Sequence, residues 1–568
     1  MNILGIGFLS ESSAALVVDG KLIAAISEER LNRRKLWYGF PEAAISEVLR
    51  IGKLKLSDID YVTTHGYLPS KPKKKAFIKK KELVLKSKLE NNEKKRIIKF
   101  LDQRYQHEVF VYEKRTPKIL AIIKSLGRPL KIYGHHHCHA ATAYYGSGWK
   151  NCDVITADGW GEDGSHTYYV GKDNKNYQDS LKVLSTSSTI DSLGYFYGSV
   201  TKALGFTPHK DEGKVLGLAA YCKNPKSYKI IRSMIDTDII NKNFIGKIED
   251  GLYLPHFDNP KLISLISKFS RQDVSASTQL SLEDVMLKFI KSLGNKKRKI
   301  ALSGGIFANV KLNQRIMELD NVEELYIFPN MGDGGLSVGS AWLAYHELTQ
   351  KYPNSPKSMY LGNSISTKKS KELLKLSDLK FKEYASINSK IAELLAKGKI
   401  VARCSGRMEF GPRALGNRSI LYNTSDTTVN QWLNKKLKRS DFMPFAPITK
   451  KENAKELYSN LDKISVSSKF MTVTTNCSDS MLADSPAAVH VDNTARPQIV
   501  TKDTAPDVYD ILCKYEEISG KKSLINTSFN MHEEPIVCDE QDAIRAFIDG
   551  QLDYLVLNNL LIEKPVKK

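Results

Sequence analysis

One short segment concentrates residues that bind metal ions. The run GHHHCHAATAYYGSG covers residues 134–148 and follows the apolar residues KIY, so a strand is expected to end there and a helix to begin. In that helix, His135 and His139 lie one turn apart on the same face and can bind one cation. His136 and His137 would point elsewhere. Two imidazoles combined with carboxylates suit Fe(II), Mn(II) or Zn(II), and the spacing does not select among them. A helix start that is His-rich by chance is the alternative.

The carboxylates of such a site must come from distant segments, because no Glu follows the first His as it would in an HExxH motif. Asp158 comes just after the predicted strand at 153–156, and Asp333 lies between another strand and a helix. Glycines beside both allow an ion or a phosphate to approach the backbone closely. Taken alone, each aspartate is better explained as a turn or helix-cap residue.

A second cluster, in the C-terminal half, suits phosphate. The segment GRMEFGPRALGNRSIL, residues 406–421, places three arginines among glycines, and guanidinium groups bind phosphate with two parallel hydrogen bonds. Nearby segments add further cationic and short polar residues, namely Lys438, Arg439, Arg496, Ser528 and Asn530. The pattern predicts an anion-binding domain, with solvated surface cations as the alternative.

The elements that position these residues follow an α/β pattern. Apolar, β-branched runs are followed by Gly or Ser and then by helical stretches, with strands expected at 2–7, 14–18, 22–27, 60–64, 109–112, 131–133, 153–156, 167–170, 299–302 and 325–328. Asp19–Gly20 joins two of these runs as a hairpin turn. Nucleotide-binding domains of the actin and sugar-kinase type begin in this way and usually consist of two related halves. Gly304 and Gly305 would open the second phosphate-facing turn.

Length and composition indicate a folded protein of two domains. The 568 residues exceed one ordinary core, and 41% hydrophobic with 26% charged residues excludes disordered and fibrous classes. Residues 351–366 are rich in Pro and Ser and predict a linker between domains at 1–350 and 367–568. No apolar run reaches the roughly 18 residues of a membrane span. The N-terminus does not read as a signal peptide, and seven scattered cysteines without a CxxC pair favour a reducing cytoplasm.

The net charge of +22 is unevenly distributed. Residues 71–99 contain twelve Lys and one Arg against three Glu. We expect a basic helical insert at about 70–105, either a solvated lysine-rich helix pair or a surface for an anionic partner. Nucleic acid is one such partner, although neither clustered arginines nor interleaved aromatic residues support base recognition.

With these motifs in place, the chain resembles the NodU/CmcH/TobZ family of O-carbamoyltransferases from end to end. The matching segments include SSAALVVDGKLIAAISEERLNRRK, HHHCHAATAYY, DEGKVLGLAAY, LSGGIFANVKLN, DGGLSVGSA, GRMEFGPRALGNRSIL, PFAP, ARPQIV and NTSFN. The resemblance implies an N-terminal TsaD/Kae-like domain of the actin/hexokinase type and a C-terminal YrdC-like domain. It implies that carbamoyl phosphate and ATP form carbamoyl adenylate in the C-terminal domain. The carbamoyl group then passes to an acceptor hydroxyl at a metal site.

The resemblance also implies roles for individual residues. A ferrous or similar ion would be held by His135, His139, Asp158 and Asp333, beside a nucleotide on Gly304, Gly305 and Asn309. Mg would accompany ATP in the C-terminal site, which would comprise Arg413, Arg418, Lys438 or Arg439, Arg496, Ser528 and Asn530. Lys35, in the stretch matching the family's EER…RK segment, would neutralise the adenylate phosphate.

The chain departs from the family pattern at two places. Ser10-Glu11 stands where relatives commonly carry His-Asp, so Glu11 is the candidate base for the acceptor hydroxyl; otherwise the base lies elsewhere or the acceptor differs in kind. The family's signature lysine aligns with Leu437, which leaves Lys436 and Lys438 as replacements. Alternatives to the small-molecule enzyme are threonylcarbamoyl transfer to tRNA and an inactive, nucleic-acid-associated relative. The acceptor and the oligomeric state are not encoded in a readable pattern.

Overall fold

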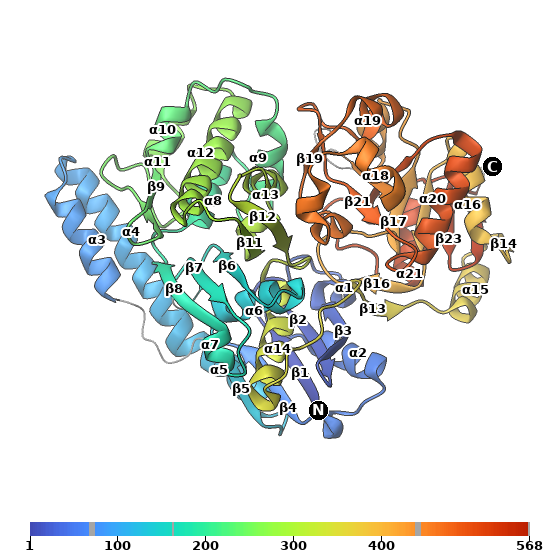
Figure 1. Ribbon diagram of the computed structural model, residues 1–568, viewed down its shortest axis with the longest axis horizontal. Helices are drawn as coiled ribbons and strands as arrows, with labels where there is room; N and C mark the ends of the chain where they lie inside the picture. Colours follow the sequence, from blue (N-terminus) through green and yellow to red (C-terminus); the bar gives the residue numbers. More distant parts are fainter. Residues whose placement is uncertain (67–73, 162–163, 438–444, 566–568) are drawn as a thin grey trace. The chain divides into compact units, whose positions relative to one another are not determined.

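The computed structural model describes residues 1–66, 74–161, 164–437 and 445–565. The chain forms two compact units, coloured along the sequence in Figure 1. The first unit comprises Met1–Phe8, Val17–Lys21 and Leu56–Ser355, and the second comprises Leu9–Leu16, Leu22–Lys55 and Pro356–Lys568. Both contain helices and strands, so the α/β class is confirmed. The grouping of residues 22–55 with the C-terminal half was not expected, and the predicted domain boundaries stay a prediction.

Two five-stranded sheets repeat one topology. The first has the order β3-β2-β1-β4-β5 and the second, written in the same sense, β8-β7-β6-β11-β12. In the first sheet β1, β4 and β5 are parallel, and in the second β6, β11 and β12 are parallel. The strands are β1 (Asn2–Gly7), β2 (Ser13–Val18), β3 (Lys21–Ser27), β4 (Tyr61–His65), β5 (Leu130–Tyr133), β6 (Cys152–Ala157), β7 (His166–Gly171), β8 (Leu181–Ser187), β11 (Arg298–Ser303) and β12 (Val322–Ile327). This repeat confirms the expected duplicated α/β architecture.

Two central helices of the first unit carry or precede the predicted metal ligands. Helix α6 (His135–Ser147) packs on β6 and β11, and α14 (Leu336–Thr349) packs on β1, β4 and α6. Small residues fill much of α6, which is buried on nearly all sides. The two helices cross at Gly339, where a Cβ atom would lie 2.1 Å from the carbonyl oxygen of Cys138. Only glycine permits this approach, which brings the start of α14 close to His139.

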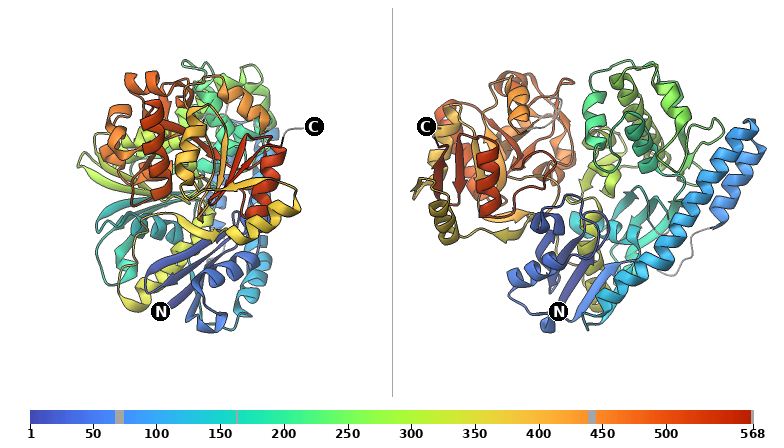
Figure 2. Two further views of the ribbon diagram at one scale, coloured as in Figure 1. Left: turned by 90° about the vertical axis from the view of Figure 1, so that its right-hand side faces the viewer. Right: turned by 180° about the vertical axis from the view of Figure 1, so that it is seen from behind.

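Further helices complete the first unit. They are α3 (Lys74–Lys86), α4 (Asn91–Phe110), α5 (Thr116–Lys124), α7 (Tyr177–Ser180), α8 (Leu193–Ala203), α9 (Glu212–Ala219), α10 (Tyr228–Arg232), α11 (Pro260–Ile266), α12 (Arg271–Ser292) and α13 (Val310–Met317), with a hairpin of β9 (Ile235–Asp238) and β10 (Asn243–Gly246). Figures 1 and 2 show α3 and α4 lying side by side along this unit. No helix in the described ranges is both long and apolar enough to cross a membrane.

The strand predicted at 109–112 is wrong. These residues form the end of α4 and the π-helical turn η2 (Val111–Arg115), which continues into α5. A short apolar run does not distinguish a strand from a buried helix segment, and the helical residues on both sides decide the outcome here.

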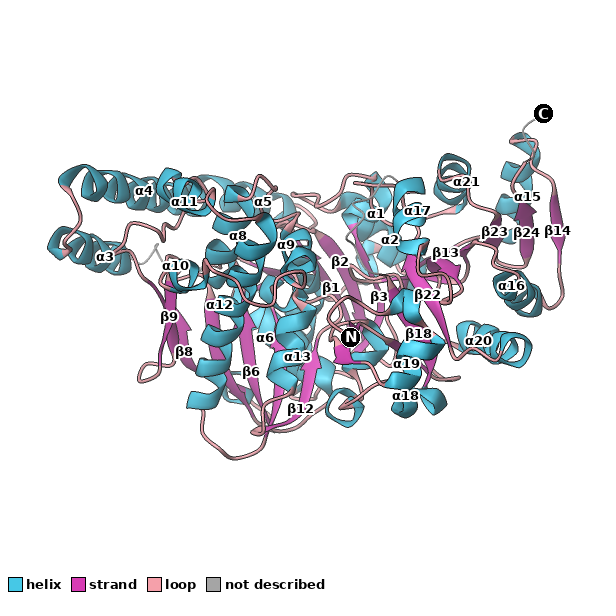
Figure 3. Ribbon diagram, turned by 90° about the horizontal axis from the view of Figure 1, so that it is seen from above, coloured by secondary structure: helices cyan, strands magenta, loops and turns pink. Residues whose placement is uncertain are grey.

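The second unit is built on one mixed sheet with the order β14-β24-β23-β15-β17-β22-β18-β21. Neighbouring residues of a strand point to opposite faces, so Leu524 and Ile525 of β22 belong to different apolar clusters. Helices α16 and α20 pack on one face, and α17 and α21 on the other. Figure 3 shows the helices in cyan and the strands in magenta.

The bounds of the second unit's elements follow the chain. The helices are α1 (Glu28–Asn32), α2 (Glu42–Gly52), α15 (Thr367–Leu376), α16 (Ile387–Ala396), α17 (Val429–Lys436), α18 (Lys451–Leu457), α19 (Asp479–Asp484), α20 (Pro506–Ser519) and α21 (Glu540–Asp549). The strands are β13 (Tyr360–Ser364), β14 (Phe381–Glu383), β15 (Val401–Cys404), β16 (Arg407–Glu409), β17 (Arg418–Tyr422), β18 (Ala446–Lys450), β19 (Thr475–Asn476), β20 (Thr494–Ala495), β21 (Gln498–Val500), β22 (Ser523–Ser528), β23 (Tyr554–Leu557) and β24 (Leu560–Glu563). β13 pairs with β16 and therefore gives regular structure to part of the segment expected as a linker.

Candidate active site

Four side chains from three segments of the first unit converge on one point. The ligand atoms of His135, His139, Asp158 and Asp333 all lie within 4.8 Å of one another. His139 Nε2 is 3.1 Å from an Asp158 oxygen and 3.6 Å from an Asp333 oxygen, and the corresponding distances from His135 Nε2 are 3.6 and 3.7 Å. The structure thus brings together every residue predicted as a metal ligand.

The distances in this cluster fit a shared cation. Four ligands placed about 2.1 Å from one tetrahedral ion are about 3.4 Å apart, and the nitrogen–oxygen distances of 3.1–3.7 Å bracket that value. Both histidines are buried, so a bound ion would be shielded from bulk water. The mixed imidazole and carboxylate donor set suits Fe(II), Mn(II) and Zn(II) alike.

Neighbouring hydrogen bonds orient the ligands. His139 Nδ1 is 3.2 Å from Ser303 Oγ, which leaves Nε2 directed at the carboxylates. Ser303 Oγ is also 3.0 Å from Thr142 Oγ1, one turn further along α6. One oxygen of Asp158 accepts a hydrogen bond from the Gly159 N–H, and the other lies toward the histidines. Such outer contacts fix the ring and carboxylate orientations that a metal site requires.

Electrostatics in the cluster reflect its burial and its opposed charges. Burial lowers the pKa of His139, but the hydrogen bonds to Asp158 and Asp333 outweigh burial and raise that pKa to about 9. Burial raises the pKa of Asp158, but the hydrogen bonds from His135 and His139 hold it well below its ordinary value. Without a cation, a proton on His139 balances the carboxylates, and metal binding has to displace that proton.

The other histidines of the segment have separate environments. His136 contacts Thr156 Oγ1 at 2.9 Å and the carbonyl oxygen of Gly164 at 3.0 Å. Burial lowers the pKa of His137 to about 4. The sequence analysis missed His65, which ends β4; its ring stacks on Phe8 and meets the ring of His135 edge-on at 6.0 Å. Its position at the end of a parallel strand, just before Gly66, was the available signal.

The predicted nucleotide turn lies beside this cluster. A Cβ atom on Gly305 would sit 3.1 Å from Asp158 Oδ1, so the turn after β11 runs directly past a predicted metal ligand. Asn309 is committed to the protein: its Oδ1 accepts from the Leu312 N–H and caps α13, and its Nδ2 donates to Gln279 Oε1 at 2.8 Å. The glycines, more than Asn309, leave backbone available to a ligand.

Glu11 and Lys35 belong to the second unit. Glu11 lies between β1 and β2 with a positive φ of 61°, and Lys35 is exposed in the turn after α1. Their predicted roles toward the acceptor and the adenylate stay predictions.

The arginines of the second unit fall into two groups. Arg418 is fully buried, and its guanidinium donates to the carbonyl oxygens of five residues, namely Asn363, Ser405, Gly406, Asn417 and Cys538. Arg407 likewise donates to the carbonyls of Ile23, Leu361 and Gly362. These donors are already used by the backbone, so the geometry does not favour the predicted phosphate contact of Arg418.

Arg413 and Arg496 have the opposite character. The buried Nε atom of each has no hydrogen-bond partner within the described part of the chain. Burial lowers the pKa of Arg413 to about 10, and burial together with the positive charge of Arg413 lowers that of Arg496 well below its ordinary value. Two neighbouring guanidiniums that destabilise each other would be stabilised by an anion bound between them.

The remaining predicted residues of this site have mixed outcomes. Ser528 ends β22, and Asn530 follows it closely in the chain. Asn530 Nδ2 donates to the carbonyls of Met531 and Glu534, so that amide group holds its own loop. Lys438 and Arg439 lie outside the described residues.

Comparison with known proteins identifies the class. Residues 2–342 match the family model described as Carbamoyltransferase N-terminus, and residues 392–564 match Carbamoyltransferase C-terminus. The chain therefore belongs to the carbamoyltransferase family, and the predicted family and enzyme class are confirmed.

Individual relatives extend this match along the chain. "Uncharacterized protein MJ1051" of Methanocaldococcus jannaschii is 33% identical over 99% of both chains. "Nodulation protein NolNO" of Sinorhizobium fredii is 29% identical over 98% of this chain and 79% of its own. "Nodulation protein NolO" of Bradyrhizobium diazoefficiens is 30% identical over 76% and 78%, respectively.

Solved structures resemble the chain only distantly. HypF of T. kodakarensis aligns with a TM-score of 0.33 and 13% identity, over 61% of this chain and 48% of its own. The Acidaminococcus fermentans (R)-2-hydroxyglutaryl-CoA dehydratase component A gives 0.35 and 15%, over 62% and 100%. These values support no conclusion about this protein, and the YrdC-like assignment stays a prediction.

Proposed function

We propose that the protein is an ATP-dependent O-carbamoyltransferase with two separate sites. The second unit would form carbamoyl adenylate, and the first would pass the carbamoyl group to a hydroxyl. One observation carries the proposal: two histidines and two aspartates meet within 4.8 Å in a chain that belongs to the carbamoyltransferase family.

The first reaction joins two polyanions. Carbamoyl phosphate, ATP and water would give carbamoyl adenylate, phosphate and pyrophosphate, with Mg accompanying ATP. Arg413 and Arg496 supply positive charge that the protein itself leaves without an acidic partner in the described ranges. They would bind the phosphate of carbamoyl phosphate and stabilise the negative charge that develops during transfer.

The second reaction would take place at the cluster of the first unit. His135, His139, Asp158 and Asp333 would hold the divalent cation, which when bound supplies a Lewis acid for the carbamoyl carbonyl. The glycines after β11 would bind the adenylate beside Asp158, because their backbone lies close to that carboxylate. Burial of both histidines would exclude water, which otherwise competes with the acceptor hydroxyl.

The proton of the acceptor hydroxyl requires a base. We assign Glu11 to this role and Lys35 to the adenylate phosphate on the family resemblance alone. The acceptor is a hydroxyl-bearing small molecule of unknown identity.

The test separates the two reactions. Pyrophosphate release should require both ATP and carbamoyl phosphate and should proceed without tRNA. His139→Ala should retain this release and lose transfer to a hydroxyl acceptor, scored by mass gain in a panel of hydroxylated metabolites. His137→Ala is the matched control, because it removes a histidine of the same helix that lies outside the cluster. Absence of pyrophosphate from metal-replete protein would refute the proposal.

A further inference from the structure

The loop between β16 and β17 presents Arg413 and is held at both of its ends. It begins after Glu409 and ends at Arg418, with Arg413 near its middle. A side chain of four rotatable bonds binds an anion well only if its backbone is fixed, because each lost degree of freedom otherwise costs binding free energy. The residues that hold the loop are therefore relevant to anion binding.

Glu409 holds the C-terminal end of this loop. Its Oε1 accepts hydrogen bonds from the backbone N–H groups of Leu415, Asn417 and Arg418, at 2.7, 2.8 and 3.1 Å. The side chain is 3% exposed, so these are charge-assisted bonds in a dry environment. One buried carboxylate thus gathers three donors that the turn itself leaves unused.

Arg30 holds the N-terminal end from a distant part of the sequence. Its Nη2 donates to the carbonyl oxygen of Gly411 at 2.8 Å, two residues before Arg413. Arg30 is 4% exposed, and its Nε lies 3.5 Å from Glu29. Burial lowers the pKa of Arg30, and the negative charges of Glu29 and Glu409 oppose that shift. The two residues that hold the loop therefore also attract each other.

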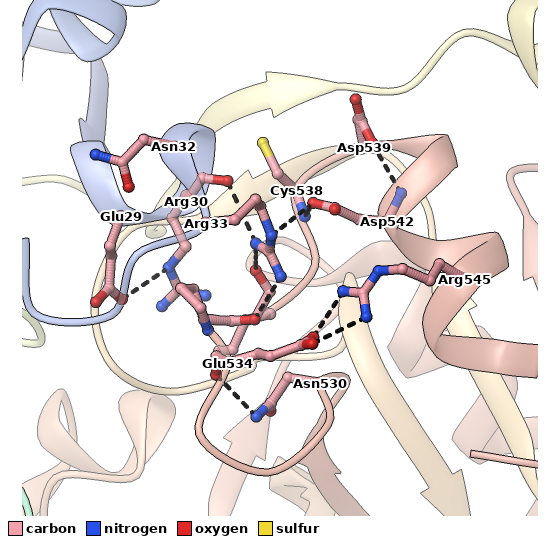
Figure 4. Close-up of polar contacts among 12 residues, drawn as sticks. Glu29, Arg30, Asn32, Arg33, Asn530, Glu534, Cys538, Asp539, Asp542 and Arg545 are labelled. Carbon is pink, nitrogen blue, oxygen red and sulfur yellow. Dashed lines mark hydrogen bonds and ion pairs between the residues drawn. The ribbon is translucent and has the colours of Figure 1, made fainter. Parts of the chain in front are cut away.

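Arg33 fixes the short helix α1 that carries Arg30. Figure 4 shows Arg33 reaching the segment that ends at Cys538, with its guanidinium directed at backbone oxygens. It donates to the carbonyls of Pro535 and Ile536, both at 2.8 Å, and its Nε is 3.2 Å from Asp542. The anchoring of α1 thus does not depend on Arg30 alone.

We propose that Arg30 and Glu409 are positioning residues for the anion site, fixing the loop at both ends so that Arg413 faces its ligand. The inference rests on the proposed function in one respect, namely that Arg413 binds the phosphate of carbamoyl phosphate. It makes residues 28–33, far away in the sequence, a structural part of the C-terminal site.

The experiment measures binding of inorganic phosphate to the full chain by calorimetry, so it needs no turnover. Arg30→Gln and Glu409→Gln should each weaken phosphate binding about tenfold, and Arg413→Gln should weaken it at least as much. Arg30→Gln combined with Arg413→Gln should bind no more weakly than Arg413→Gln alone, because Arg30 acts only through Arg413. A merely structural role would not produce this non-additivity.

Matched controls come from the same segment. Arg50→Gln and Glu47→Gln break an exposed ion pair on α2 and should leave phosphate binding unchanged. Arg30→Lys keeps the charge but loses the planar fork, and it serves as the second variant where Arg30→Gln unfolds; it too should weaken phosphate binding.

The outcomes separate this inference from the proposed function. Unchanged phosphate affinity in folded Arg30 and Glu409 variants overturns the positioning role, and absence of phosphate binding by the unmodified protein overturns the anion site altogether. If phosphate binds and the variants weaken it, but no pyrophosphate forms from ATP and carbamoyl phosphate, the positioning role holds and the proposed reaction fails.

Discussion

The metal-ligand cluster of the first unit and the arginine loop of the second use buried charge in opposite ways. In the cluster, imidazoles and carboxylates face each other and compensate one another. In the loop, Arg413 and Arg496 lower each other's stability as cations, while Arg418 is satisfied by carbonyl oxygens. Residue type alone does not distinguish a binding arginine from a structural one. The number of donors already used by the protein does.

The largest expected effect concerns the cluster. Asp158→Asn removes one negative charge and should lower carbamoyl transfer by about 1000-fold, because a weakly held cation no longer stabilises the developing charge. Single-turnover transfer from preformed carbamoyl adenylate measures this step. Equal rates for the variant and the unmodified protein would remove Asp158 from the metal site.

The next effect is on stability and distinguishes the two kinds of arginine. Arg418→Gln leaves several buried carbonyls without donors and should lower the free energy of unfolding by about 3 kcal/mol. Arg413→Gln removes a buried charge that has no acidic partner in the described ranges and should leave that free energy unchanged or higher. Urea denaturation compares the two variants, and an equal loss in both would contradict the division.

Binding should show the reverse order. Arg413→Gln should raise the KM for carbamoyl phosphate by about 30-fold, the equivalent of one charge-assisted hydrogen bond of about 2 kcal/mol. Arg407→Gln, at a guanidinium used by backbone carbonyls, is the control and should change this KM little. Pyrophosphate release at varied carbamoyl phosphate gives both values.

The smallest expected effect lies outside the ligand set. Ser303→Ala removes the hydroxyl beside His139 Nδ1 and should weaken metal binding by about tenfold. A competition assay with a chelator dye measures the affinity. A Ser303→Thr variant keeps the hydroxyl and should lose less.

Parts of this account could be predicted from the sequence because they are local or periodic. The one-turn spacing of His135 and His139 and the Asp-Gly turns at strand ends indicated the cluster without any coordinates. The repeated strand pattern indicated the duplicated sheets. Strand ends on the same edge of a parallel sheet meet in space, so distant aspartates could be assigned together.

Other parts depend on tertiary contacts that no local pattern encodes. The sequence cannot show that Arg418 is enclosed by carbonyls while Arg413, five residues earlier, is not, because the acceptors come from residues 363, 405, 406 and 538. The same holds for Arg30, whose partner Gly411 is 381 residues away. The apolar run at 109–112 was assigned to a strand because helical context, not composition, decides its structure.

The most direct test of the central claim is the metal content of three proteins after anaerobic dialysis against Fe(II). The unmodified chain and Arg413→Gln should each retain one ion per chain, and Asp158→Asn should retain none or bind it far more weakly. Equal retention by Asp158→Asn and the unmodified chain would show that the four side chains do not form the cation site.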